Sequence, residues 1–375
     1  MKIIYVHQKN FHQRPPVIST TMLIASLEVK LEVITTGITP YFANLFQEKG
    51  ISYKVIPFQY YSSTIKNSLW SELWGRKARK YIAERSKEEE TVLWIEGNHT
   101  ITSLGYRFIN KYPHVLQLQE LFGIHLLKDR IQHYYMRKVS QTAIAIMCPE
   151  YNRSYIYYAY FKLKSLPYVM PNKQVFFSGL EDAKGYEKKY TWLKERIAGR
   201  RVILYQGTTS KERKLDNFIK AFNQLDPSKY VFVLMGKSSP LVEEYKKFNS
   251  SLIHIDYIPA PEYLYVTSLA YIGVLSYSSY ELNTVYCAPN KIFEYGMYSV
   301  PMIGNDIPGL RYLLDFYHIG KVCDLNSIDS ILRSFNYIIE NYDLLSQNAR
   351  RYYESIDNRV IIEKVLSDIK ESVRN

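Results

Sequence analysis

Short apolar runs alternate with amphipathic stretches along almost the whole chain. In the first half, the apolar runs predict strands at 2–6, 31–35, 53–56, 91–95, 115–119 and 143–148. Stretches of helical periodicity lie between several of them, at 20–27, 69–85 and 123–140. Strands that alternate with helices indicate βαβ units, and therefore a parallel sheet whose two faces are both covered.

This pattern stops around residues 169–172, and a polar segment at 173–189 follows. A second series of apolar runs then predicts strands at 202–206, 230–235, 252–256, 272–276, 301–303 and 320–323. The helices expected with them lie at 190–198, 214–224, 239–248, 261–268, 291–297 and 328–341. The chain therefore contains the same kind of alternation twice.

Two such series predict an α/β fold with two doubly wound, Rossmann-like domains. We place the first domain at 1–172, a linker at 173–199, the second domain at 200–355 and a terminal helix within 356–375. The length of 375 residues suits two domains. Ligands bind such sheets outside the carboxyl ends of the strands, so a two-domain protein is expected to hold its site in the cleft.

The net charge of +12 favours an acidic partner, such as nucleic acid, an anionic membrane or a phosphorylated substrate. Nucleic acid is disfavoured, because the basic residues are dispersed and are not interleaved with aromatic residues on one face. The three cysteines are scattered and fit a reducing cytosol. No signal peptide and no uninterrupted apolar run of about 18 residues is visible, so we expect a cytoplasmic protein.

The first strand-to-helix junction of the second domain carries candidate phosphate-binding chemistry. The strand ends at Gly207, and a loop with Lys211, Arg213 and Lys214 precedes a helix. A glycine lets backbone approach a ligand, and the start of a helix offers unpaired N–H groups. Arg213 suits a bidentate contact with a diphosphate. The alternative is a solvated loop with ordinary surface cations.

The second junction is the stretch YCAPNKIFEYGMYSVPMIGND, residues 286–306. We expect Asn290 at the N-cap of a helix and Lys291 at its first position. A cation there opposes the helix dipole unless an anion lies between them. Glu294, one turn deeper, suits a pair of vicinal hydroxyls such as those of a ribose. The alternative is a capped helix in which Glu294 is simply exposed or paired.

Together, QGTTSKERKLDNFIKAF and APNKIFEYGMYSVPMIGND resemble the C-terminal domain of retaining GT-B glycosyltransferases with an E-x7-E motif. The resemblance implies two Rossmann-like domains that face each other across a cleft. The first would bind the acceptor and the second the nucleotide sugar, and a helix at about 359–373 would cross back to the first domain.

The resemblance also implies roles for individual residues of the second domain. Arg213 and Lys291 would neutralise the donor diphosphate as catalytic residues, and Glu294 would bind the ribose hydroxyls. The backbone of Ile258 would contact the base. The donor-binding set implied by these positions is Gly207, Thr208, Ile258, Tyr286, Asn290 and Glu294.

The sequence departs from the family's pattern at three places. Tyr286 stands where the first glutamate of the motif is expected, and Glu281 nearby has the wrong spacing. Thr208 replaces an arginine that commonly follows the loop glycine, and the loop HQKNFHQRPPV lacks paired glycines. The missing glutamate supports an alternative, in which the chain is a non-catalytic GT-B-like partner that stabilises an active glycosyltransferase. A GT-B-like epimerase would be expected to supply clear acid and base carboxylates.

Polar groups also end two strands of the first domain. Glu96 and His99 follow one predicted strand, and Glu120 follows the next. Either carboxylate suits orientation or deprotonation of an acceptor hydroxyl, and we take Glu96 as the third catalytic candidate. Satisfied polar groups at strand ends are the alternative.

The segment 70–80 combines Trp70 and Trp74 with four cations at helical spacing. This pattern is typical of a helix at an anionic membrane surface, but also of a helix whose tryptophans pack on the sheet. The first reading would place the protein at the inner face of the plasma membrane, near a lipid-linked acceptor.

The resemblance thus implies transfer of a hexosyl or N-acetylhexosaminyl group from a nucleotide sugar, with UDP favoured, to a hydroxyl of a glycan or lipid-linked acceptor. The product would be a surface polysaccharide or glycoconjugate. The resemblance implies that no metal or other cofactor is needed, and the lack of a DxD-like pair at a strand end agrees with this. A homodimer is possible.

Overall fold

The computed structural model describes residues 1–59, 61, 64–121, 127–175, 183–210, 213 and 215–374. The chain folds into two compact units. Unit 1 comprises Met1–Val175 with Asp357–Asn375, and unit 2 comprises Phe176–Ile356. The start of the helix predicted at 123–140, and Lys211 and Lys214 of the predicted phosphate loop, lie outside the described residues.

Within the described residues, unit 1 is built on a seven-stranded parallel sheet with the order β3-β2-β1-β4-β5-β6-β7. The strands are β1 (Lys2–His7), β2 (Lys30–Thr35), β3 (Ser52–Val55), β4 (Thr91–Glu96), β5 (His114–Gln117), β6 (Ala145–Cys148) and β7 (Tyr168–Val169). Its helices are α1 (Pro15–Ser26), α2 (Pro40–Glu48), α3 (Thr64–Arg85), α4 (Asn98–Leu104), α5 (Tyr106–Ile109), α6 (Leu127–Ser140), α7 (Tyr151–Phe161) and α18 (Asn358–Arg374).

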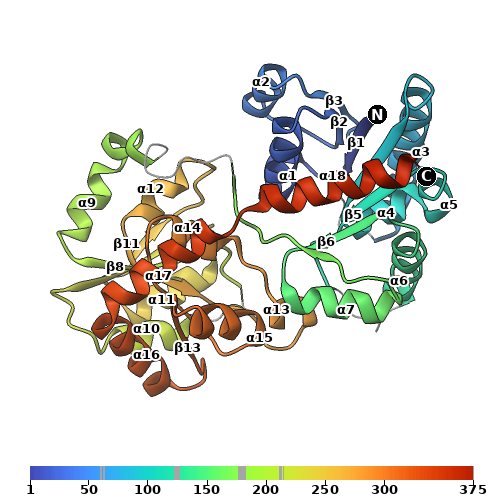
Figure 1. Cartoon of the computed structure of the whole chain (residues 1–375). Coiled ribbons are helices and arrows are strands. Elements are labelled where there is room, and N and C mark those ends of the chain that lie inside the picture. Colours follow the sequence, from blue (N-terminus) through green and yellow to red (C-terminus); the bar gives the residue numbers. More distant parts are fainter. Residues whose placement is uncertain are drawn as a thin grey trace. The chain divides into compact units, whose positions relative to one another are not determined.

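The last helix of the chain belongs to unit 1. In Figure 1, α18 runs beside α1, although the two helices lie at opposite ends of the sequence. Asn358 donates to the carbonyl oxygen of Pro171 at 2.7 Å, and Tyr168 Oη donates to Asp368 at 2.8 Å. The expected return of the C-terminal helix to the N-terminal sheet is therefore confirmed.

Unit 2 is built on a six-stranded parallel sheet, within the described residues, with the order β10-β9-β8-β11-β12-β13. Its strands are β8 (Arg201–Gln206), β9 (Tyr230–Met235), β10 (Ile253–Ile255), β11 (Ala270–Leu275), β12 (Met302–Asn305) and β13 (Gly320–Cys323). Its helices are α9 (Thr191–Ile197), α10 (Asp216–Phe222), α11 (Pro240–Phe248), α12 (Tyr263–Ser268), α13 (Leu282–Val285), α14 (Asn290–Met297), α15 (Pro308–Arg311), α16 (Ile328–Glu340) and α17 (Tyr342–Ser355).

Both sheets are covered on their two faces, which explains why their strands are continuous apolar runs. Residues 3–6 of β1 and 231–234 of β9 are fully buried. The strands predicted from these apolar runs coincide with the observed strands to within about two residues at each end. The two-residue strand β7 and the helices α2, α4, α5, α7, α13, α15 and α17 were not predicted.

Each sheet has a position at which its strand order reverses. In unit 1 the chain moves outward from β1 through β2 to β3 and then returns to place β4 on the other side of β1. In unit 2 the same reversal places β11 beside β8. Ligands of doubly wound sheets bind at such switch points, beyond the carboxyl ends of the two strands. Each unit therefore offers one preferred position for a site.

Candidate active site

Two cations converge on bare backbone at the switch point of unit 2. Gly207 directly follows β8 and has a φ of +138°, which favours glycine. A Cβ built on Gly207 would stand 3.0 Å from Lys291 Cε, 3.1 Å from Lys291 Nζ and 3.8 Å from an Nη of Arg213. The structure therefore brings together Gly207, Arg213 and Lys291, which the sequence placed on two separate junctions.

Neither cation of this group is neutralised by a carboxylate of the described residues. The guanidinium of Arg213 lies over the ring of Tyr277, 5.0 Å from its centroid. Burial, together with the charge of Arg213, lowers the pKa of Lys291, and Glu294 only partly opposes this effect. Two neighbouring cations that lack counterions, beside a backbone without a side chain, are suited to a phosphate or diphosphate.

Glu294 lies one turn further along α14 and is held by polar partners. Its side chain is buried, with 8% of the residue exposed. Gln206 Nε2 donates to one carboxylate oxygen at 2.5 Å, and Tyr263 Oη donates to the other at 3.0 Å. Thr267 in turn donates to Gln206 Oε1 at 2.8 Å. These contacts fix the carboxylate in one orientation, as recognition of a pair of hydroxyls requires.

The start of α14 differs by one position from the prediction. The N-cap is Pro289, no side chain caps the helix, and Asn290 is its first residue. The prediction of Asn290 as the N-cap is therefore wrong, because Pro289 already has the extended conformation of a cap, with its φ fixed by the ring. Lys291 becomes the second residue and so still lies in the first turn of the helix, where the N–H groups have no partner within the helix.

The remaining donor candidates lie around this group in different ways. The carbonyl oxygen of Thr208 accepts a hydrogen bond from Tyr205 Oη at 2.8 Å, which fixes the backbone after Gly207. Ile258 is buried in the hydrophobic core, so its backbone, not its side chain, is the part suited to a ligand. Tyr286 ends α13 and is half-buried, with its backbone packed against Gly309.

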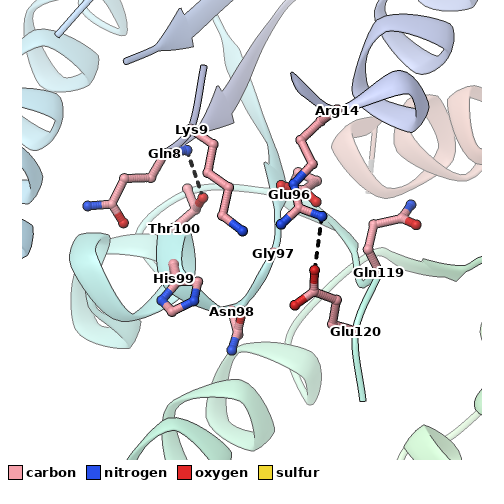
Figure 2. A pocket seen from close by; sticks show the side chains of 10 residues that line it. All are labelled: Gln8, Lys9, Arg14, Glu96, Gly97, Asn98, His99, Thr100, Gln119 and Glu120. Atoms are coloured by element: carbon pink, nitrogen blue, oxygen red, sulfur yellow. Dashed lines mark hydrogen bonds and ion pairs between the residues drawn. The ribbon is translucent and has the colours of Figure 1, made fainter. Parts of the chain in front are cut away.

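A pocket marks the switch point of unit 1 (Figure 2). It lies beyond the carboxyl ends of β1, β4 and β5. Its lining residues are Gln8, Lys9, Arg14, Glu96, Gly97, Asn98, His99, Thr100, Gln119 and Glu120. The structure thus brings Glu96, His99 and Glu120 to one pocket. The sequence reasoning missed Lys9 and Arg14, although both lie in the loop HQKNFHQRPPV that was noted for its lack of glycines.

Glu96 is nearly buried, with 5% of the residue exposed, and is paired within unit 1. One of its oxygens lies 2.7 Å from Nδ1 of the fully buried His7. Burial alone would raise the pKa of Glu96, but His7, Arg14 and Lys9 together lower it. The carboxylate is therefore held in the charged form, as accepting a proton requires.

Glu120 forms the second carboxylate of the pocket and is more accessible. Arg14 Nη1 donates to it at 2.9 Å, as Figure 2 shows. Burial opposes this ionisation, but Arg14 and Lys9 lower the pKa of Glu120 below its ordinary value. Tyr157 Oη donates to its carbonyl oxygen at 2.8 Å and so fixes the turn after β5.

On α3, Trp74 faces inward, whereas Trp70 is half-buried. Trp74 is buried, with 1% exposed, and its Nε1 donates to the carbonyl oxygen of Ile56 at 3.0 Å. The exposed apolar residues are instead Ile65, Leu69 and Leu73, which are 75%, 61% and 48% exposed. In the described residues, no helix is long and apolar enough to span a membrane.

Two doubly wound α/β units with a returning C-terminal helix make up the fold of the GT-B glycosyltransferases. No protein-family model matches the chain, and no curated protein matches it by sequence. Solved structures match it over nearly its whole length. HepE from Anabaena, in complex with UDP-glucose, has 13% sequence identity and a TM-score of 0.72, with 99% of this chain and 100% of that chain covered.

Two further structures show the same fold. A glycosyltransferase from Rickettsia africae has 13% identity and a TM-score of 0.74, with 100% of this chain and 99% of that chain covered. WaaG, a glycosyltransferase involved in lipopolysaccharide biosynthesis, has 14% identity and a TM-score of 0.63, with coverages of 98% and 99%. The predicted fold class is therefore confirmed.

Proposed function

We propose that the protein is a glycosyltransferase that moves a hexosyl or N-acetylhexosaminyl group from a nucleotide diphosphate sugar to a hydroxyl of a glycan or lipid-linked acceptor. The observation that carries the proposal is the group formed by Gly207, Arg213 and Lys291 at the switch point of unit 2. UDP is the favoured nucleotide, since HepE, which has the same fold, is seen in complex with UDP-glucose.

In this proposal, each polar residue of unit 2 meets one part of the donor. Arg213, Lys291 and the first N–H groups of α14 neutralise the diphosphate. Glu294, oriented by Gln206 and Tyr263, accepts hydrogen bonds from the ribose hydroxyls. The backbone near Ile258 faces the base.

The reaction breaks the bond between the anomeric carbon and the diphosphate oxygen and forms a bond to the acceptor oxygen. Negative charge grows on the departing diphosphate, and fixed cations stabilise this charge most where it develops. We infer retention of the anomeric configuration, with the proton of the acceptor hydroxyl passing to the departing phosphate. Glu96 is placed on the acceptor side, where its charged carboxylate orients that hydroxyl.

A second feature supports a membrane-associated acceptor. Exposed apolar residues Ile65, Leu69 and Leu73 and the exposed cations Lys66 and Lys77 share one face of α3. Such a face suits the surface of an anionic membrane. The proposal therefore places a lipid-linked acceptor at the inner face of the plasma membrane.

The second candidate function is a non-catalytic GT-B-like partner that stabilises an active glycosyltransferase. Tyr286 at the position of the first motif glutamate is the observation that favours it. Titration of UDP and GDP by calorimetry separates the two, because a partner that has lost the donor site binds neither nucleotide. For the enzyme, a screen of nucleotide sugars for thermal stabilisation and slow hydrolysis identifies the donor. A screen in which no nucleotide sugar stabilises the protein would refute the proposal.

A further inference from the structure

One cation in the pocket of unit 1, Lys9, forms no ion pair with any residue that the structure describes. Glu96 is hydrogen-bonded to His7 at 2.7 Å, and Glu120 is paired with Arg14 at 2.9 Å. Each carboxylate of the pocket is thus already matched. Among the described residues, the ammonium group of Lys9 makes no hydrogen bond and no ion pair. Lys9 is therefore a charged side chain of this pocket that lacks a direct hydrogen-bonding or ion-pair partner in the part of unit 1 that the structure describes.

The backbone of Lys9 is fixed by hydrogen bonds. Its carbonyl oxygen accepts from Thr35 Oγ1 at 2.6 Å and from the N–H of Thr36 at 3.3 Å. The preceding residue, Gln8, donates its N–H to Thr100 Oγ1 at 3.0 Å and accepts from Ser103 at 2.7 Å. Lys9 is therefore part of a built pocket wall, unlike a lysine on a mobile surface loop.

The side chain of Lys9 points into the pocket, between the ring of His99 and the guanidinium of Arg14 (Figure 2). Burial first, and then the charge of Arg14, lower the pKa of Lys9, while Glu120 and Glu96 partly oppose them. The charge of Lys9 also contributes to the lowered pKa of His99. A partly buried cation without a counterion is costly, and an anionic ligand would offset that cost.

We propose that this pocket binds an acceptor with an anionic group, a phosphate or a carboxylate, whose charge is neutralised by Lys9. The anion site is argued from the residues of unit 1 alone. That its ligand is the acceptor of a transfer reaction rests on the function proposed above. A neutral sugar would leave the charge of Lys9 unmatched. The donor diphosphate does not need Lys9, because Arg213 and Lys291 already supply two cations to it in unit 2.

The test compares three small sugars as probes of the native full-length protein at low salt. Methyl glucuronide carries a carboxylate, glucose 6-phosphate carries a phosphate, and methyl glucoside is neutral. Their dissociation constants are measured by ligand-observed NMR, together with that of UDP by calorimetry. The variants are Lys9→Met, which removes the charge, Lys9→Arg, which keeps it, and Lys49→Met, an exposed control outside the pocket.

We expect at least one charged sugar to bind about tenfold more tightly than methyl glucoside, as one charge-assisted hydrogen bond provides. Which charged sugar binds better identifies carboxylate or phosphate as the group. This preference should disappear in Lys9→Met and persist in Lys9→Arg and Lys49→Met, with the affinity for UDP unchanged in all three.

Equal affinity for charged and neutral sugars in the native protein would overturn the inference. A preference for charged sugars that survives in Lys9→Met would also overturn it. A loss of UDP binding in Lys9→Met would overturn it too, because Lys9 would then belong to the donor site. If the native protein binds charged sugars preferentially but binds no nucleotide, the anion site stands and the proposed transferase function fails.

Discussion

The ammonium group of Lys291 lies against the backbone of Gly207, so that a Cβ on that glycine would stand 3.1 Å from Nζ. The two residues are separated by several strands and helices in the sequence, yet they meet at the reversal between β8 and β11. The missing side chain of the glycine leaves room for the lysine, and the lysine places its charge where the backbone is open. This contact defines the position we assign to the donor diphosphate.

Replacing Gly207 with alanine should therefore weaken nucleotide binding. The added Cβ would displace Lys291 Nζ and would also be strained at a φ of +138°. We expect the dissociation constant for UDP to rise about tenfold or more, since such strain and displacement cost at least about 1 to 3 kcal/mol.

Gly199→Ala is the matched control for this variant. Gly199 also has a positive φ, of +75°, but a Cβ there meets no atom within 4 Å. Gly199→Ala should therefore also carry backbone strain, although less than Gly207→Ala, and should keep its affinity for UDP. If both variants bind UDP equally well, the contact between Gly207 and Lys291 has no role in binding the donor.

Glu294→Gln should remove the preference for a ribose with free hydroxyls. A carboxylate accepts hydrogen bonds from both hydroxyls, and bonds to a charged group contribute about 1.5 to 3 kcal/mol. The native protein should bind UDP at least about tenfold more tightly than 2′,3′-dideoxy-UDP. The variant should bind the two equally, as measured by calorimetry.

Glu281→Gln serves as the control, because Glu281 is exposed and lies before α13. It should keep the full preference for UDP. A preference that persists in Glu294→Gln would mean that the buried carboxylate is structural and only braces Gln206 and Tyr263.

As the pH rises, the affinity for the donor should begin to fall at a lower pH than it would if Lys291 had the pKa of an ordinary lysine. Burial and Arg213 lower the pKa of Lys291 in the free protein, and its near neighbours Glu294 and Cys287 oppose the shift. Only the charged form attracts a diphosphate, so affinity is full below the free-state pKa and declines as the pH rises through it. Binding above that pKa should also take up a proton, which calorimetry in two buffers of different ionisation enthalpy detects.

In Lys291→Arg the alkaline decline should disappear, because arginine stays protonated throughout the accessible range. A native protein whose UDP affinity is constant up to the ordinary lysine pKa of 10.5 would show that Lys291 does not face the phosphates.

The exposed face of α3 should bind anionic vesicles. Native protein should float with vesicles that contain phosphatidylglycerol at low salt, and the double variant Leu69→Gln with Leu73→Gln should remain unbound, because both leucines are exposed. Leu344→Gln, at an exposed leucine of α17 in unit 2, is the control and should float like the native protein. Absence of native protein from the floating fraction would contradict a membrane role.

The apolar pattern predicted most of the fold because buried parallel strands are almost continuously apolar. Residues 3–6 illustrate this, since all four are fully buried. The pattern failed where an element is very short or buries only a few of its residues. Strand β7 has only two residues, and α17 carries mostly polar residues around its few buried positions, such as Leu345 and Ala349.

The candidate site could be predicted only where its chemistry is local in sequence. Gly207 and Arg213 follow the end of a strand, and Lys291 and Glu294 lie at the start and one turn inside a predicted helix, which made them visible. The support of Glu294 by Gln206 and Tyr263 joins residues from three separate elements, and no sequence pattern indicates such contacts. On α3, the sequence left open whether the tryptophans face a membrane or pack on the sheet, because the pattern alone does not say which side of the helix faces inward, and the buried Trp74 agrees with the second reading.

Turnover of the donor tests the central claim most directly. Once the nucleotide-sugar screen has identified a donor, its hydrolysis or transfer is measured for native protein, Arg213→Ala and Lys291→Ala, with Arg196→Ala in α9 as the surface control. We predict that each of the first two variants loses turnover about a hundredfold or more, as removal of a fixed oxyanion donor does, while the control is unaffected. Native turnover in both Arg213→Ala and Lys291→Ala would contradict the proposed site.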